Sequence, residues 1–189
     1  MRKILCVTYR SWATDIYNAL SRDLPNHDFK IINNKSDFDE SIIDEFNPDI
    51  ILWYGWSWIV PDRILDKYTS LCLHPSPLPK YRGGSPIQNQ IIDGVKTSAV
   101  TIFKMGKGLD DGDIISQLPL SLEGNISDIF KRMSYLGFSS TLDIITKGYL
   151  FSILSGTIQL QPYHNIISGL NSSILDSSKS DLLLIILKS

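Results

Sequence analysis

The sequence has 189 residues, of which 43% are hydrophobic and 20% charged, and its formal net charge is −2. This length suits one domain with a sizeable core. The sequence holds no cluster of Lys and Arg, which argues against nucleic-acid binding by bulk electrostatics. No stretch approaches the roughly 20 apolar residues of a membrane span, and the first apolar run is too short for a secretory signal. We therefore expect a cytoplasmic protein that does not bind nucleic acid or membranes. The two cysteines, Cys6 and Cys72, lie in apolar stretches, and we expect free thiols.

The first half of the chain alternates between predicted strands and helices. The apolar run Lys3–Thr8 predicts a strand, and Ser11 is placed to cap a helix whose apolar residues follow helical spacing. The following predictions are, in order, a strand at Phe29–Ile32, a helix at Ser36–Phe46, a strand at Asp49–Tyr54, a helix at Pro61–Lys67 and a strand at Ser70–His74. This alternation predicts an α/β fold, with a Rossmann-like, mostly parallel sheet and helices on both faces.

The second half opens with a loop rich in Pro and Gly. The predicted elements after this loop are a helix at Pro86–Ile92, strands at Ser98–Met105 and Ile114–Leu122, and a long helix from Ser127 to about Leu150. The tail from about His164 has poor helical or strand periodicity, and no element is assigned to it. We expect a catalytic domain at 1–155 and an unassigned tail at 156–189.

Two residues are candidates for acid–base chemistry. In open α/β sheets, ligands bind beyond the carboxyl ends of the strands, and His74 directly follows a predicted buried strand. The acidic turn Gly108–Asp113 lies between two strands and is predicted to place a carboxylate over the same edge. A His and a carboxylate beside a Gly-rich loop indicate proton transfer on a bound small molecule. The residues alone also fit a structural His74 and an Asp110 that only forms the turn.

Two sequence blocks resemble the formyltransferase family. The first runs from His74 to Gln88 (His-Pro-Ser-Pro-Leu-Pro-Lys-Tyr-Arg-Gly-Gly-Ser-Pro-Ile-Gln), and the second, from Thr101 to Ile114, contains Leu-Asp-Asp-Gly-Asp. The resemblance covers most of the chain up to about Leu150. It implies a Rossmann-like domain that transfers a formyl group from 10-formyltetrahydrofolate to a primary amine, with no metal.

The resemblance also implies roles for individual residues. His74 would be the catalytic histidine that stabilises negative charge on the formyl oxygen, and Asp110 would be the carboxylate that orients the imidazole and helps to take the amine proton. The loop Tyr54–Pro61 would line the pterin pocket, with Trp56 or Trp58 adding stacking area. The implied cofactor-binding residues are Tyr54, Gly55, Trp56, Trp58, Ile59, Leu109 and Asp110. The implied substrate-binding residues are Tyr9, Arg10, Ser76, Pro77, Arg82, Gly83, Gly84 and Gln88.

One position departs from the family pattern. The family has Asn two residues before the histidine, where its amide polarises the carbonyl, and here that position is Cys72. A thiol is a weak hydrogen-bond donor. The contact to the formyl oxygen would then be weakened or come from another group, such as a backbone N–H or the Gln88 side chain, at a cost of about 10- to 1000-fold in rate.

The acceptor is expected to be a nucleotide-linked amino sugar, such as a UDP-linked 4-amino sugar of bacterial surface glycans. The loop Val7–Trp12 lacks the glycines of the phosphate-binding loop of glycinamide ribonucleotide formyltransferase. The short, weakly charged remainder after Leu150 argues against the extra tRNA-binding domain of methionyl-tRNA formyltransferase. A folate- or sugar-nucleotide-binding protein with impaired catalysis, or formylation of another amine, remains the alternative. A homodimer is one expected assembly.

Overall fold

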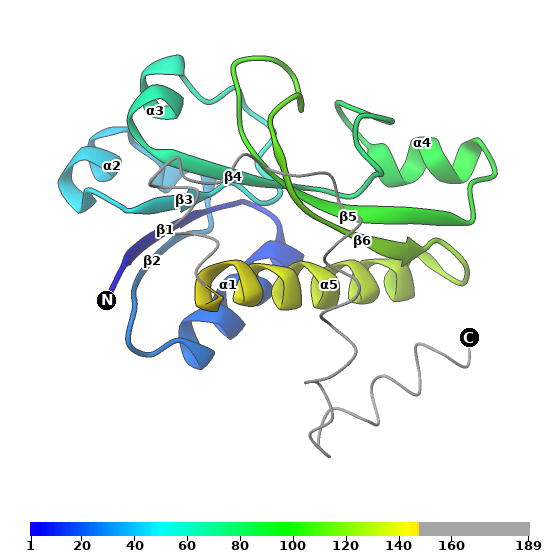
Figure 1. Cartoon of the computed structure of the whole chain (residues 1–189), viewed down its shortest axis with the longest axis horizontal. Helices are drawn as coiled ribbons and strands as arrows, with labels where there is room; N and C mark the ends of the chain where they lie inside the picture. Colours follow the sequence, from blue (N-terminus) through cyan, green and yellow to red (C-terminus); the bar gives the residue numbers. More distant parts are fainter. Residues whose placement is uncertain (148–189) are drawn as a thin grey trace.

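The computed structural model describes residues 1–147 as a six-stranded sheet with helices on both faces (Figure 1). The strands are β1 (Lys3–Val7), β2 (Asp28–Ile32), β3 (Ile50–Leu52), β4 (Thr69–His74), β5 (Thr97–Lys104) and β6 (Ile114–Ser121). Their spatial order is β2-β1-β3-β4-β5-β6. The first four strands are parallel, and β5 is antiparallel to both β4 and β6. The expected Rossmann-like, mostly parallel α/β fold is confirmed.

The helices are divided between the two faces of this sheet. They are α1 (Ser11–Asp23), α2 (Ser41–Phe46), α3 (Asp62–Lys67), α4 (Pro86–Ile92) and α5 (Ile126–Thr146), with a 3₁₀ turn at Lys35–Asp37. In Figure 1, α1 and α5 lie side by side under one face, and α2 and α3 lie on the other. Because strand side chains alternate between faces, β1, β2 and β3 contribute both to a larger core on the side of α1 and α5 and to a smaller core on the side of α2 and α3.

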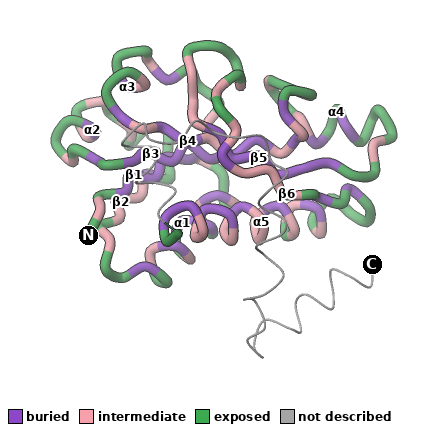
Figure 2. Tube along the Cα trace, in the orientation of Figure 1, coloured by how far each residue is buried: buried purple, intermediate pink, exposed green. Residues whose placement is uncertain are grey.

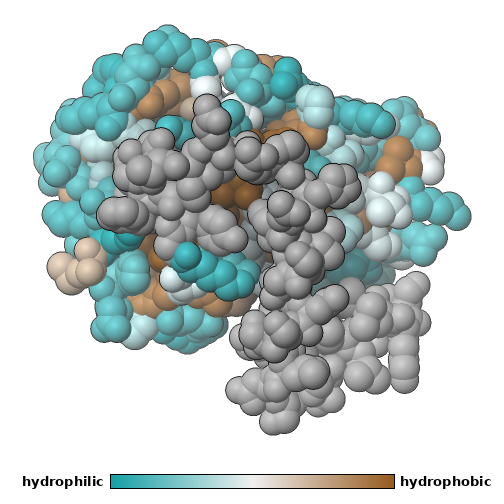
Figure 3. Space-filling model, viewed as in Figure 1, coloured by the Kyte–Doolittle hydropathy of each residue, from teal (hydrophilic) through white to brown (hydrophobic). Residues whose placement is uncertain are grey.

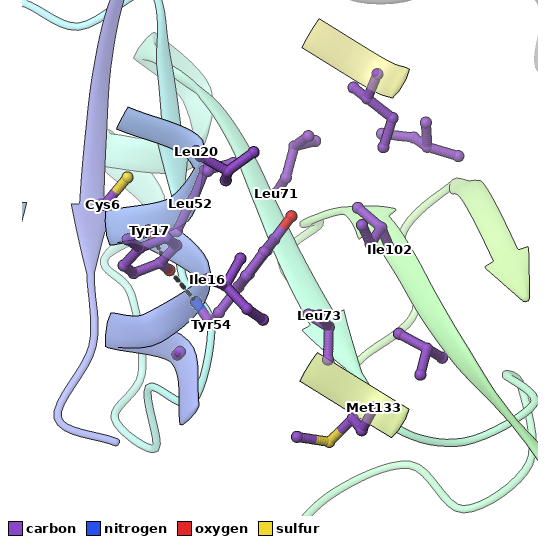
Figure 4. Close-up of a cluster of buried hydrophobic side chains, with 14 of the residues drawn as sticks. Cys6, Ile16, Tyr17, Leu20, Leu52, Tyr54, Leu71, Leu73, Ile102 and Met133 are labelled. Carbon is purple, nitrogen blue, oxygen red and sulfur yellow. Dashed lines mark hydrogen bonds between the residues drawn. The ribbon is translucent and has the colours of Figure 1, made fainter. Parts of the chain in front are cut away.

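The larger core lies between the sheet and the pair α1 and α5. Its residues from β1, β3 and β4 include Ile4, Ile50 and Leu71, and most of this layer is fully buried (Figure 2). The Tyr17 hydroxyl donates to the carbonyl oxygen of Leu52 at 2.8 Å and accepts the Tyr54 N–H at 2.8 Å (Figure 4). These bonds satisfy backbone groups where β3 ends, and so fix the start of the loop that follows.

Gly137 allows α5 to come this close to the sheet. A Cβ at this position would lie 2.5 Å from Cδ1 of Leu73 and 3.1 Å from Cδ1 of Ile16. Since Leu73 precedes His74, this packing also supports the strand end at which the histidine lies.

Two details differ from the sequence-based expectations. The segment Ser36–Phe46 is not one helix but a 3₁₀ turn and the short α2, separated by Phe38, whose backbone is extended. Its apolar residues Phe38, Ile42 and Ile43 instead reach the smaller core from a bent chain. Ser11 does not cap α1, because Arg10 is the N-cap residue and Ser11 is already helical.

The surface on the viewed side of residues 1–147 is largely hydrophilic, with scattered hydrophobic patches (Figure 3). Within these residues, no helix combines the length and the apolar character needed to cross a membrane. Cys6 and Cys72 are free thiols, as expected. The predicted tail at 156–189 and the end of the long helix predicted up to Leu150 lie outside the described residues, as does the predicted domain boundary at 155.

Candidate active site

His74 is the last residue of β4 and lies on the face opposite to α1 and α5. Leu71 and Leu73 pack into the larger core, so the alternation of the strand directs Cys72 and His74 to the other face. Only 6% of His74 is exposed. A buried strand end holds the imidazole in place more firmly than a loop would.

Asp110 reaches His74 by a route that the sequence did not predict. Because β5 is antiparallel to β4, its last residue, Lys104, pairs with Leu71, while Thr101 pairs with His74. The loop after β5 therefore leaves the sheet three residues away from His74, roughly 10 Å along the strand. It folds back over the sheet face and brings Oδ2 of Asp110 to 3.5 Å from Nδ1 of His74.

The conformation of this hairpin depends on local backbone features. Asp110 has a left-handed backbone with φ of 47°, which Asp tolerates better than most residues. A Cβ at Gly112 would overlap the carbonyl oxygen of Lys104, so only glycine fits where the hairpin closes. The backbone N–H of Gly83 donates to Oδ2 of Asp110 at 2.8 Å. This oxygen is thus fixed from the glycine-rich loop as well as facing the imidazole.

The second nitrogen of His74 also faces an oxygen atom. Nε2 lies 2.7 Å from the carbonyl oxygen of Tyr81, in the loop between β4 and α4. A carbonyl oxygen only accepts, and an ionised carboxylate only accepts. The ring can donate to both oxygen atoms only when both of its nitrogens carry protons. The contact to Tyr81 was not predicted, because it depends on how the loop folds.

A buried polar network holds that loop in place. Nε2 of Gln90, which is fully buried, donates to the carbonyl oxygens of Pro75 and Pro86 at 2.9 Å each, and Ser98 donates to Oε1 of the same amide. Thr101 donates to the carbonyl oxygen of Ser76 at 2.6 Å. Gln90 thus joins the two ends of the loop. Prediction from the sequence missed it, since only its burial distinguishes it from the neighbouring polar residues of α4.

Cys72 lies two residues before His74 on the same face of β4, and its thiol already has a hydrogen-bond acceptor. Sγ donates to the carbonyl oxygen of Trp53 at 3.4 Å. Burial raises the pKa of the Cys72 thiol well above its ordinary value, and the negative charge of Asp110 raises it further. The group therefore stays a neutral thiol and is neither a thiolate nucleophile nor a free donor toward a ligand.

The remaining residues that the sequence predicted for the site differ in burial and therefore in their access to a ligand. Tyr54 turns its side chain into the larger core, where its hydroxyl meets that of Thr141 at 2.8 Å, so only its backbone can face a ligand. Ser76 is fully buried and its hydroxyl donates to the Lys80 carbonyl oxygen, a contact that shapes the loop. Gln88, by contrast with Gln90, is exposed on α4. Arg82 and Gly84 are exposed, and Pro77 and Gly83 are half-buried in the same loop.

Apolar side chains are exposed in two loops of the candidate site. Ile59, after β3, is 96% exposed, and Leu109, beside Asp110, is 70% exposed. Leu109 lies over Gly83, with its Cδ2 3.6 Å from where a Cβ would be. Such side chains can cover a flat heteroaromatic ligand such as a pterin.

The structure also brings the first loop against the loop after β3. The Tyr9 hydroxyl and Oγ of Ser57 lie 2.6 Å apart, and the rings of Tyr9 and Trp58 lie 4.8 Å apart. Gly55 has φ of 65°, and a Cβ there would lie 2.8 Å from Cγ of Arg10. The predicted substrate residues Tyr9 and Arg10 therefore join the predicted cofactor loop in one surface.

Comparisons with known proteins agree with this architecture. The family profile described as Formyl transferase matches residues 5–128. A methionyl-tRNA formyltransferase from Macrococcus caseolyticus is 36% identical over 135 residues, which cover 69% of this chain and 42% of that protein. The structure of methionyl-tRNA formyltransferase from Clostridium thermocellum superposes with a TM-score of 0.72 at 32% identity, covering 78% of this chain and 66% of that one.

A protein from Mycobacterium tuberculosis, proposed as a sugar N-formyltransferase, shares the fold with a TM-score of 0.63 at 22% identity, covering 83% of this chain and 69% of that one. The expected closeness to the sugar enzymes is therefore not reflected in these similarities. The chain spans about two fifths of the length of the curated relatives it matches.

Proposed function

Because this chain belongs to the formyltransferase family, we propose that it transfers a formyl group to a primary amine. When bound, 10-formyltetrahydrofolate would supply the formyl group. The observation that carries the proposal is the approach of Asp110 to His74, at 3.5 Å, from a distant part of the chain. The exposed apolar side chains of Leu109, which precedes Asp110, and of Ile59, in the loop after the neighbouring strand β3, are available to cover a folate ring system.

The residues of the site have complementary tasks in this reaction. As the amine nitrogen bonds to the formyl carbon, negative charge develops on the formyl oxygen, and a protonated His74 can donate to that oxygen. Asp110 orients the ring before the ligand oxygen takes its place at Nδ1, and it then accepts the proton that the amine loses. The bond between the formyl carbon and its carrier nitrogen would then break, with the carrier nitrogen taking up the proton that Asp110 holds. Cys72 remains a spectator, because its S–H donates to Trp53.

For His74 to donate to the formyl oxygen, one of its present neighbours must give way. The Nε2 contact to Tyr81 is short, at 2.7 Å, whereas the Nδ1 contact to Asp110 is long for a hydrogen bond, at 3.5 Å. The Nδ1 side is therefore the one on which a ligand oxygen can compete. The formyl oxygen would then lie between the imidazole and the Asp110 hairpin.

The acceptor that we propose is the amine of a nucleotide-linked amino sugar, within bacterial surface-glycan synthesis. The first loop holds Tyr9 and Arg10 rather than glycines, which supports an acceptor other than a simple ribonucleotide phosphate. A second candidate is methionyl-tRNA, favoured by the 36% identity to an enzyme of that name. Both acceptors present a primary amine to the same catalytic pair.

In the experiment, the purified 189-residue chain is incubated with 10-formyltetrahydrofolate and one of three acceptors at a time. The acceptors are a UDP-linked 4-amino sugar, glycinamide ribonucleotide and methionyl-tRNA. Mass spectrometry follows the formylated product, and the matching UDP sugar with a hydroxyl group in place of the amine is the control. We expect formylation of the amino sugar and none of the control. Folate binding without turnover on any amine would instead support a binding protein with impaired catalysis.

A further inference from the structure

The roles proposed for His74 and Asp110 do not involve a cluster of aromatic side chains in the loops of the neighbouring strands. The cluster consists of Tyr9, Phe38, Trp56 and Trp58, contributed by the loops after β1, β2 and β3. Trp56 lies 4.7 Å from Trp58 and 5.1 Å from Phe38 between ring centroids, and Tyr9 lies 4.8 Å from Trp58. Trp58 is 43% exposed. Phe38 and Trp56 pack on one side against the smaller core, so the cluster forms the edge of this core, with Trp58 as its exposed side chain.

Two cations flank this cluster. Nζ of Lys35 lies 5.0 Å from the ring centroid of Trp58 and 5.2 Å from that of Trp56, and the Arg10 guanidinium carbon lies 4.4 Å from the Tyr9 centroid. Within residues 1–147, neither cation pairs with a carboxylate, whereas Lys67 and Lys107 do. The cluster therefore combines open aromatic surface with positive charge that the described residues do not neutralise.

This combination favours a ligand that is both aromatic and anionic. Nucleobases stack on exposed aromatic rings, and Lys and Arg bind phosphate oxygens through charge-assisted hydrogen bonds. An inorganic anion would not stack on the rings, and an uncharged apolar ligand would not pair with Lys35 and Arg10. A nucleoside phosphate uses both features.

The position of the cluster agrees with an extended acceptor. The sheet order β2-β1-β3-β4 puts the loop after β3, with Trp56 and Trp58, one strand away from His74, the loop after β1 two strands away and the loop after β2 three strands away. At the usual strand spacing the cluster therefore extends from roughly 5 Å to roughly 14 Å from β4. A ligand with its amine at His74 can also reach Tyr9, Arg10 and Lys35 only if a linker separates its amine from its base, as sugar and diphosphate do in a nucleotide sugar.

We propose that the cluster of Tyr9, Phe38, Trp56 and Trp58, with Lys35 and Arg10, binds the nucleoside phosphate part of the formyl acceptor. This rests on the proposed function. It assigns the rings of Trp56 and Trp58 to the acceptor instead of the folate. The nucleotide of a nucleotide-linked amino sugar and the terminal nucleotide of a tRNA share this chemistry, so the binding measurement must separate them.

The test is isothermal titration calorimetry of the full 189-residue chain with UDP, AMP, uridine and inorganic pyrophosphate. We expect UDP to bind at least about tenfold more tightly than uridine or pyrophosphate, because each of these offers only half of the recognised chemistry. Tighter binding of AMP than of UDP would point to the tRNA end as the source. No saturable binding of either nucleotide below about 1 mM would overturn the proposal.

Variants locate the binding surface. Trp58→Ala and Lys35→Met should each weaken nucleotide binding by about tenfold, with Trp58→Phe retaining part of the affinity. Lys30→Met is the matched control, since Lys30 also lies over an aromatic ring, that of Phe46, but away from the cluster. Equal affinities in Trp58→Ala, Lys35→Met and the control would reject the cluster as the site.

Competition separates this inference from the proposed function. If 5-formyltetrahydrofolate displaces UDP competitively, the cluster belongs to the folate site and the inference is wrong. If both bind together, the cluster belongs to the acceptor as proposed. Formyl transfer to an amine that carries no nucleotide, together with absent UDP binding, would overturn the inference while leaving the proposed function intact.

Discussion

The thiol of Cys72 donates a hydrogen bond to the carbonyl oxygen of Trp53, at 3.4 Å, from the same strand face on which His74 lies two residues later. The contact joins β4 to the end of β3 and uses the thiol's one proton. The family pattern has an amide at this position. An amide has two donor hydrogens, so it can keep one contact and offer the other to a ligand.

Replacing Cys72 with Asn should therefore raise the rate of formyl transfer. If the amide supplies the missing donor to the formyl oxygen, the expected gain in kcat is at most about 100- to 1000-fold, the cost of removing a single donor of this kind. Steady-state kinetics with 10-formyltetrahydrofolate and the best acceptor measure it. Cys72→Ala is the control and should leave kcat near the wild-type value. Lower activity in Cys72→Asn than in Cys72→Ala would contradict this account of the position.

Gly112 should be required for the hairpin that carries Asp110. In Gly112→Ala the new methyl group overlaps the Lys104 carbonyl oxygen, a backbone atom that cannot move aside cheaply. We expect a loss of roughly 1–3 kcal/mol in the free energy of unfolding and a fall in turnover, because Asp110 shifts away from His74. Urea unfolding measures the first effect and kinetics the second.

Gly84→Ala is the matched control for stability. A Cβ at Gly84 meets nothing within 4 Å, and its backbone does not require glycine. Its free energy of unfolding should stay within about 0.5 kcal/mol of the wild type. Equal stability of the two variants would show that the hairpin adapts to a side chain at position 112.

Removal of the Gln90 amide should affect the active-site loop. Gln90→Leu leaves the carbonyl oxygen of Pro75 without its donor and the hydroxyl of Ser98 without its acceptor. Buried unsatisfied groups cost about 1–3 kcal/mol each, so the variant should be measurably less stable in urea. Its kcat should also fall, since this loop presents the Tyr81 carbonyl oxygen to His74. Unchanged kcat in a destabilised variant would limit Gln90 to a structural role.

Stability should decrease in alkaline solution. Burial raises the pKa values of the Cys6 and Cys72 thiols above 9.0 and those of the Tyr17 and Tyr54 phenols above 10.0. The unfolded chain loses these protons at the ordinary pKa values while the native chain keeps them, so the native state binds more protons above pH 9. Stability is then fully present below this pH and is lost as the pH rises.

Each such group contributes a slope of about −1.4 kcal/mol per pH unit once it ionises only in the unfolded state. Urea unfolding at a series of pH values measures the total slope. Tyr17→Phe removes one of the groups and should flatten the slope above pH 10, even though the loss of its hydrogen bonds lowers stability at every pH. A stability that stays constant across this range would contradict the assigned burial of these groups.

The sequence predicted most of the fold because its signals are local. The apolar runs before Tyr9, Tyr54 and His74 identified three parallel strands. Pro86 marked the first residue of α4 correctly. The break at Phe38 was missed, because apolar spacing does not distinguish a helix from a bent chain that reaches the same core. The capping role of Ser11 was wrong by one residue, a common uncertainty at helix ends.

The candidate site was predictable only in part. Sequence blocks indicated His74 and Asp110 as partners, but their contact depends on β5 running antiparallel to β4 and on a hairpin that folds back, and neither is encoded in local spacing. The supporting contacts of Tyr81 and Gln90 arise from tertiary packing. Lys35 and Phe38 join the aromatic cluster from a segment that carries no motif, so only the folded chain reveals them.

The most direct test of the central claim is a double-mutant cycle on His74 and Asp110, measured as kcat for formyl transfer. We use His74→Ala, Asp110→Asn and the double variant; Asn tolerates the left-handed backbone at position 110 and can still accept the Gly83 N–H. If the two side chains act as one unit, each single change lowers kcat by about 10²- to 10⁴-fold and the double variant is little worse than either. Wild-type kcat in either single variant would contradict the account.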